Sequence, residues 1–354
     1  MTSTSQSRQQ SLPVTVSAAD YPAASRRFDM LVVLAGFWVI GGLYWDGWAH
    51  DQRLVDTFFT LWHAVLYSGF LAVATVIGGS QVRNMWRGHS LSRALPRGYR
   101  ISLIGVIIFA FGGGFDLVWH SIFGFEADID ALISPAHLLL AFGAILFMSG
   151  PLRAAWMRAR TTPQKGWADL LPAVLALFLV YLALSFFTQY THPLGAPRLL
   201  VRTVGLERYF VALQIVTATL VFTALLMGVL LVGMRRFPLP AGSVTLLLFG
   251  GMLLMFLTRE RSTQGFAVVL PVALGVGLLA DLGMWRWRPS VERVLALRFF
   301  SFGLPFGFFI AYYVGILLTR GLVITEHLWI GTSIMAGVTG LFLSYLAAPP
   351  VVGE

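Results

Sequence analysis

The sequence is dominated by apolar runs of about 20 residues, the length that an α-helix needs to cross the hydrocarbon core of a bilayer. Of its 354 residues, 57% are hydrophobic and only 12% are charged. Ten runs are long enough to be spans: about 28–46, 54–79, 100–121, 132–157, 168–190, 207–234, 241–258, 264–285, 293–319 and 326–347. The sequence therefore predicts an all-α, polytopic integral membrane protein with about ten transmembrane helices.

Positive charge is distributed unevenly between the segments that connect these runs. If the N-terminus lies in the cytoplasm, 18 of the 25 Lys and Arg residues fall on the cytoplasmic side. This asymmetry predicts ten spans with both termini inside. The net charge of +9 then reflects topology, and the absence of a compact basic patch argues against a nucleic-acid partner.

The polar N-terminal segment that precedes Tyr21 contains no apolar h-region, so a cleavable signal peptide is not expected. Arg outnumbers Lys 24 to 1, a bias that GC-rich genomes produce, which favours a bacterial plasma membrane. We expect a cytoplasmic tail over 1–27, a four-helix metal-site bundle over 28–160, a six-helix bundle over 161–347 and a short tail over 348–354.

Two well-separated segments of the predicted four-helix bundle repeat one polar pattern. Each has an Asp, a His one helical turn later and a second His in the next apolar run: Asp46, His50 and His63 form the first trio, and Asp116, His120 and His137 form the second trio. Carboxylates and imidazoles are costly near lipid and are rarely retained there without a role. The repeat predicts that the first two helical hairpins are a tandem pair whose trios bind metal, either at one dinuclear site or at two mononuclear sites.

Helix geometry favours chelation within each trio. Residues i and i+4 lie one turn apart on one face of a helix, so Asp46 and His50 can aim at a common point, as can their counterparts in the second trio. A carboxylate with two imidazoles suits Cu, Fe(II) or Zn. The absence of Cys excludes thiolate sites, iron–sulfur clusters and Cys-linked haem.

The second histidine of each trio is expected on the returning helix of its hairpin. His63 is expected some nine residues into its helix, roughly 13 Å along the axis at 1.5 Å per residue. His137 follows Ser134 and Pro135, which predict a helix start with Ser as the cap and Pro in the first turn. Antiparallel packing would bring both histidines back beside the first pair.

The polar residues of the two trios have two alternative interpretations. Polar residues are routine at helix ends, and Trp45, Trp48 and Trp119 are spaced like an interfacial aromatic belt. His63 and His137 could also be axial ligands of a haem, but a haem leaves the paired Asp residues unexplained. The repetition of the whole trio favours a metal ion.

Three further polar residues have two interpretations each. Glu126 lies in an acidic linker over 123–130 that is either a solvated loop or a lip that attracts cations, and it is predicted as an additional ligand. His192, after the fifth run, is either an interfacial anchor or a further ligand. Asp281 is expected to be the counter-ion of Arg286 and Arg288, and its alternative role is in a proton or ion path through the membrane.

The first trio also resembles a known motif. Asp46-x3-His50-x12-His63 is similar to the copper-ligand motif of the C subunit of particulate methane and ammonia monooxygenases, and the resemblance is confined to the stretch 46–63. The second trio keeps the first half of this pattern and has a longer gap before His137. The resemblance implies copper as the first metal to test, with iron or zinc as alternatives.

Three classes of function follow from these observations. The first is a membrane metalloprotein that binds one or two metal ions at the extracytoplasmic face, as in a copper-dependent membrane oxidoreductase. The second is a transporter of metal or another solute that uses the trios as its entry site. The third is a structural or assembly subunit. The expected partners are the lipid bilayer, a metal ion, and other membrane subunits or an extracytoplasmic metal chaperone.

Overall fold

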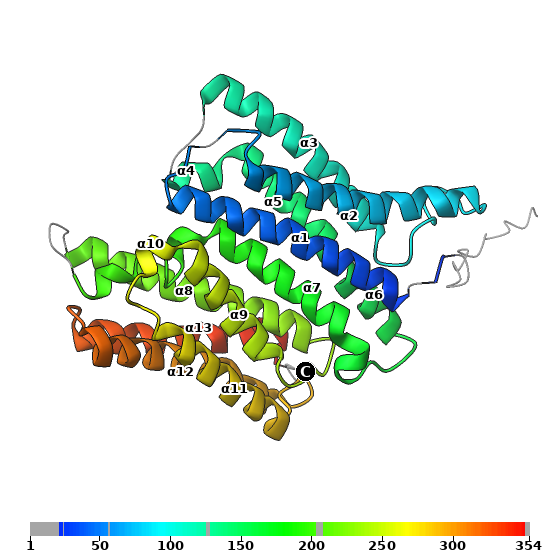
Figure 1. The fold of residues 1–354 in the computed structure, drawn as a ribbon. Helices are drawn as coiled ribbons and strands as arrows, with labels where there is room; N and C mark the ends of the chain where they lie inside the picture. The colour runs from blue at the N-terminus through cyan, green and yellow to red at the C-terminus, as the bar shows by residue number, and fades with distance from the viewer. Residues whose placement is uncertain (1–20, 24, 56, 125–127, 203–207, 351–354) are drawn as a thin grey trace, which may run out of the picture.

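The computed structural model describes residues 21–23, 25–55, 57–124, 128–202 and 208–350, and all regular secondary structure within these ranges is helical (Figure 1). Nine helical segments in these ranges are long and apolar enough to cross a membrane. The elements are α1 (Arg26–Asp51), α2 (Leu61–Trp86), α3 (Arg100–Phe123), α4 (Asp128–Ile133), α5 (Pro135–Met148), α6 (Gly150–Ala159), α7 (Gly166–Phe187), η2 (Gln189–Thr191), η3 (Pro197–Leu200), α8 (Arg208–Met234), α9 (Ser243–Thr258), α10 (Glu260–Thr263), α11 (Val269–Trp287), α12 (Val294–Arg320) and α13 (Glu326–Ala347). The prediction of an all-α protein built from membrane-type helices is confirmed.

The run expected over 241–258 forms α9, an apolar helix of 16 residues that is shorter than the nine. Helices α5 and α6 together make one of the nine, interrupted near Gly150. The cause is Pro151, which has no N–H to donate to the carbonyl of Phe147. The Ser102 hydroxyl of α3 donates to that carbonyl instead, at 3.3 Å.

Each of the first two hairpins is an antiparallel pair of closely packed helices, α1 with α2 and α3 with α5. Close approach depends on glycine. A Cβ at Gly42 would lie 2.6 Å from the backbone N of Leu66, and one at Gly143 would lie 2.8 Å from the backbone N of Phe109. Small residues at such contacts are typical of helix pairs in membranes.

The start of α2 differs from the expected position. The helix begins at Leu61 and not near residue 54, and it continues to Trp86. Thr60 has an extended backbone, and the preceding Thr and Phe residues are weak helix formers. They form an isolated turn, closed by a hydrogen bond of 3.2 Å from the backbone N of Thr60 to the Thr57 carbonyl, which does not continue into α2. His63 is therefore the third residue of α2, so the prediction that it lies about nine residues into the helix was wrong.

Helix α7 is the most buried of the nine long segments and contacts α1, α5 and α6 as well as α8 and α9. In Figure 1 it lies between α1 on one side and α9 on the other, and it contacts both. The division into two helical bundles at residue 160 stays a prediction. The end of the molecule at which α1 ends and α2 begins, at the left in Figure 1, is called the trio end below.

Asp281 of α11 joins this helix to the start of α9 by hydrogen bonds. Its carboxylate accepts hydrogen bonds from the backbone N of Val244 and of Thr245, at 3.1 and 2.9 Å, and from the Thr245 hydroxyl at 2.6 Å. A carboxylate is stabilised at the N-terminus of a helix by the free N–H groups there. Asp281 therefore caps α9 from α11, and no ion pair joins it to Arg286 or Arg288, both of which the structure describes. The expectation of a counter-ion was wrong.

Candidate metal centre

The first trio converges on one carboxylate oxygen at the trio end. Asp46 Oδ1 lies 3.6 Å from His50 Nε2 and 3.2 Å from His63 Nε2. Asp46 and His50 come from the last turns of α1, and His63 comes from the first turn of α2. The i,i+4 pair is set by the helix, and the antiparallel packing of α1 and α2 supplies the third member.

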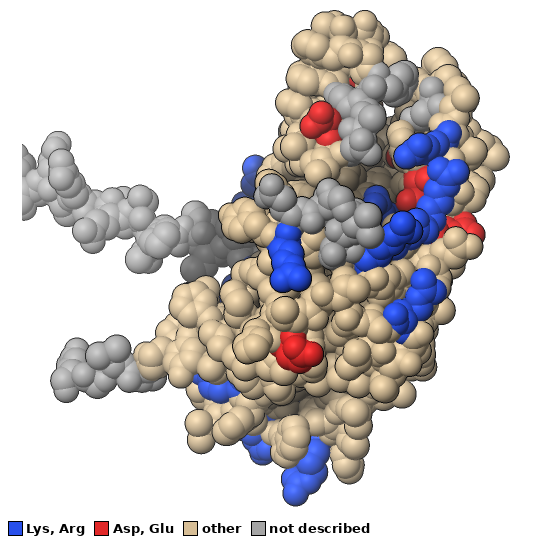
Figure 2. Space-filling view, turned by 90° about the vertical axis from the view of Figure 1, so that its left-hand side faces the viewer, with Lys and Arg blue, Asp and Glu red and all other residues tan. Residues whose placement is uncertain are grey.

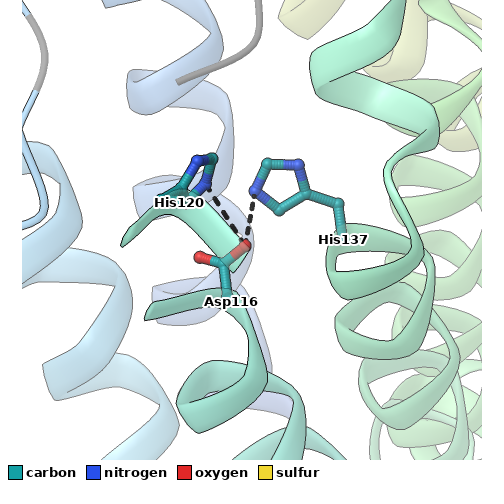
Figure 3. Close-up of side chains that lie close together, drawn as sticks. All are labelled: Asp116, His120 and His137. Carbon is teal, nitrogen blue, oxygen red and sulfur yellow. Dashed lines mark ion pairs between the residues drawn. The ribbon is translucent and has the colours of Figure 1, made fainter. Parts of the chain in front are cut away.

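The second trio has the same arrangement on the next hairpin. Asp116 Oδ1 lies 3.4 Å from His120 Nε2 and 3.2 Å from His137 Nε2, as Figure 3 shows. One ligand atom from each of these residues lies within 4.8 Å of the other two, so the group could hold a metal ion. Within the described part of the chain, this is the group of three that meets this condition.

The second histidine of each trio occupies the same position in its helix. This was not evident from the sequence, because the gap between the first and second histidines is longer in the second trio. The residue before α2 is Thr60 and the residue before α5 is Ser134, so His63 and His137 are each the third residue after a hydroxyl-bearing cap. The longer gap in the second trio is taken up by the linker that contains α4. The signal in the sequence was Ser or Thr, two residues and His, repeated at the start of both returning helices.

Hydrogen bonds at the far ring nitrogen orient three of the four imidazoles. Nδ1 of His63 lies 2.9 Å from the Thr57 carbonyl oxygen, Nδ1 of His120 lies 3.0 Å from the Gly124 carbonyl oxygen, and Nδ1 of His137 bonds to the Ala131 carbonyl oxygen. A carbonyl only accepts, so each Nδ1 carries the proton. In the neutral ring Nε2 then presents a lone pair to the Asp oxygen.

This arrangement fits a bound cation. A lone pair on Nε2 and a carboxylate oxygen repel each other at 3.2–3.4 Å unless a proton or a metal ion lies between them. Metal–ligand bonds of about 2.0–2.2 Å in a tetrahedral site place the ligand atoms about 3.4 Å apart. The backbone carbonyls behind the rings are the supporting hydrogen bonds that metal-ligating histidines usually have.

Both trios border one cavity of about 1630 Å³. Five of the six residues line it: Asp46, His50, His63, Asp116 and His137. Apolar side chains, among them Leu66, Phe70 and Phe109, line the same space. The rings of Phe70 and Phe109 stack with their centroids 4.6 Å apart, which joins the two hairpins.

The remaining predicted residues have different outcomes. Glu126 lies outside the described residues. His192 is buried, accepts a hydrogen bond from the backbone N of Leu194 at Nδ1 and packs edge-on against Phe222. Burial, together with the Arg259 guanidinium, lowers the pKa of His192 to about 3, so the ring is neutral. His192 is absent from the lining of the large cavity and joins neither trio.

Four arginines also line the cavity, and sequence reasoning did not assign them to a site. They are Arg53, Arg198, Arg259 and Arg261. All four belong to the seven Lys and Arg residues that fall outside the predicted cytoplasmic segments. Their departure from the positive-inside pattern was the signal that could have singled them out.

Comparison with known proteins gives no further assignment. No protein-family model, no curated protein and no solved structure matches the chain. The membrane-type helices and the Asp116, His120 and His137 group are therefore the features on which a function is inferred.

Proposed function

We propose that this protein is a membrane metalloprotein that binds one or two copper ions through the two trios, at the extracytoplasmic end of its helices. The observation that carries the proposal is the pairing of an oriented Nε2 lone pair with a carboxylate oxygen in both trios. One cation relieves the repulsion in each trio and satisfies both ligand types at once.

Copper is preferred for two reasons. Imidazole with carboxylate suits Cu(II), which binds such sites more tightly than the other divalent first-row metals, and the first trio resembles a copper-ligand motif. Iron and zinc are the alternatives for the same donor set. Bound copper would supply one-electron redox chemistry, and this supports a role as a membrane oxidoreductase.

The protein's own residues would tune such a site. The carbonyls of Thr57, Gly124 and Ala131 keep the rings in one tautomer and fix their direction. The partly buried carboxylates of Asp46 and Asp116 supply negative charge that balances a divalent ion.

Metal analysis of the purified protein tests the proposal. Wild type, His63→Ala and His137→Ala are loaded with Cu(II), freed of excess metal and assayed for copper, iron and zinc per chain. His89→Ala, a histidine outside both trios, is the matched control. We expect each trio variant to lose up to one copper ion per chain and the control to lose none; equal metal content in all four proteins refutes the proposal.

Transport uses the same residues for a different purpose, and proteoliposomes distinguish the two. With copper outside, a metalloprotein retains bound copper without filling the vesicle lumen. Accumulation in the lumen that is lost in His63→Ala and His137→Ala would replace the metalloprotein proposal with transport.

A further inference from the structure

The chemistry of the cavity changes in order along a single helix. The α1 residues that line it run from Val39, Ile40 and Leu43 through Asp46 and His50 to Arg53, which follows the helix end. At 1.5 Å per residue this sequence covers about 20 Å. The cavity is therefore apolar at its inner end, which is called the floor below and includes Val39, Ile40 and Leu43. The two trios lie in the middle. At the trio end the cavity is lined by Arg53, Arg198, Arg259 and Arg261, and this part is called the mouth below.

The mouth carries an excess of positive charge. Four arginines and three aspartates line the described part of the cavity, and two of those aspartates belong to the trios. The third, Asp51, accepts a hydrogen bond from the backbone N of Arg261 at 2.9 Å and lies 3.8 Å from Nε of Arg259. Figure 2 looks onto this end and shows Lys and Arg side chains along one side of it, with Asp or Glu among them.

Two of these arginines have guanidinium groups available for a ligand. The side chains of Arg53 and Arg261 are exposed and make no hydrogen bond or ion pair with another described residue. Arg259, in contrast, donates to the Gln189 side chain and to the carbonyl of Gly195. A guanidinium is the side chain that best matches a carboxylate or phosphate, through paired hydrogen bonds.

The later part of the chain holds the mouth against α1. Glu260 of α10 accepts hydrogen bonds from Trp48 Nε1 at 3.0 Å and from Gln52 Nε2 at 3.5 Å. The Arg198 side chain, from η3, donates to the carbonyl of Arg261. The arginines at the mouth thus come from segments far apart in the sequence that the fold brings together.

The floor is apolar and deep. Lining residues on α5 run from His137 past Leu140 and Ala144 to Met148, about 16 Å along the helix. Ile40 and Met148 at this depth are almost completely buried. The whole cavity exceeds the roughly 300–1,000 Å³ of common small-molecule sites, so two metal ions and their waters leave most of it for something else.

We propose that the cavity binds an amphipathic anion, with a carboxylate or phosphate head at Arg53 and Arg261 and an apolar chain along the floor. The inference deepens the proposed function, because it names the class of ligand that would lie beside the metal trios. The trio residues are not needed for the ionic contact, so the two proposals can fail separately.

Binding of radiolabelled palmitate to the full-length protein in a neutral maltoside detergent tests the inference. Competition by hexadecyl phosphate, hexadecanol, octanoate and acetate separates the contributions of head and chain. We expect hexadecyl phosphate to compete, hexadecanol to compete at least about tenfold less well because it lacks the charge, octanoate to compete weakly and acetate not at all. Palmitate and hexadecyl phosphate have chains of the same length, so their relative strengths show whether the site prefers a carboxylate or a phosphate head.

The double variant Arg53→Gln with Arg261→Gln is expected to bind palmitate at least about tenfold more weakly, since two charge-assisted contacts are lost. Arg202→Gln, an exposed arginine near this end that does not line the cavity, is the matched control and should bind as wild type does. Copper content is measured in every protein and should not change. Hexadecanol binding as tight as palmitate, or unchanged palmitate affinity in the double variant, overturns the inference. If copper binding proves independent of the trios while palmitate binding still needs the arginines, the metalloprotein proposal fails and the anion site stands.

Discussion

The two trios use the same three residue types, yet their first histidines are enclosed to different degrees. The His50 side chain in the first trio is 43% exposed, whereas its counterpart His120 in the second is 9% exposed. The His50 to Asp46 distance is 3.6 Å, and that from His120 to Asp116 is 3.4 Å. The i,i+4 spacing therefore sets a similar distance between the two groups in both trios, while the surroundings set how exposed the histidine is.

The cap residues of the two returning helices also differ in what they do. Ser134 accepts a hydrogen bond from the backbone N of His137, so it caps α5. Thr60 makes no such bond to the backbone of α2, and its hydroxyl lies 3.0 Å from Nδ1 of His63. Ser134 stabilises the start of its helix, whereas Thr60 contacts the imidazole ring of His63.

The largest expected difference concerns the first histidine of each trio. His120→Ala should lower copper affinity at the second trio by roughly 100-fold or more, because it removes an enclosed ligand whose ring is fixed by Gly124. His50→Ala should cost the first trio only about tenfold, since water can replace an exposed ligand. Competition with a chromophoric chelator measures both. Equal losses would show that enclosure does not distinguish the trios.

Carboxylate replacements test whether the trios are independent. Asp46→Asn and Asp116→Asn keep the shape of the side chain and remove its charge, so each should lower copper affinity by about tenfold. Each Asp pairs with histidines of its own hairpin, so we expect the free-energy changes to add in the double variant. A double variant that is markedly less impaired than the sum would instead indicate one dinuclear centre.

Acid should release copper from both trios, because imidazole binds a metal only as the neutral base. Dialysis at pH 7, 6 and 5 followed by metal analysis measures the loss, which we expect below about pH 6. Copper added back at pH 7 should restore the original content; failure to do so would mean that acid had unfolded the protein.

Local pattern and tertiary contact account for what the sequence could and could not predict. The i,i+4 pairs follow from helical periodicity alone, and the Ser134 cap before His137 followed from side-chain chemistry. The start of α2 was missed because the aromatic and β-branched residues before Thr60 extend the apolar run, and hydropathy alone does not separate them from the first turns of a membrane helix. The arginine mouth was missed for another reason: Glu260 meets Trp48 across 212 positions in the sequence, and no local pattern records that contact.

The smallest expected effects separate the two cap residues. Ser134→Ala should lower the free energy of unfolding by about 1 kcal/mol, the usual cost of losing a helix cap, with little change in copper affinity because the Ala131 carbonyl still holds His137. Thr60→Val should instead affect copper affinity more than stability. It removes the hydroxyl beside His63 Nδ1 and leaves the Thr57 carbonyl in place, so copper affinity should fall a few-fold. Stability, measured by thermal melting in detergent without metal, should hardly change. If Thr60→Val lowers the melting temperature as much as Ser134→Ala and leaves copper affinity unchanged, the two caps have the same role and the contrast between the trios is confined to their enclosure.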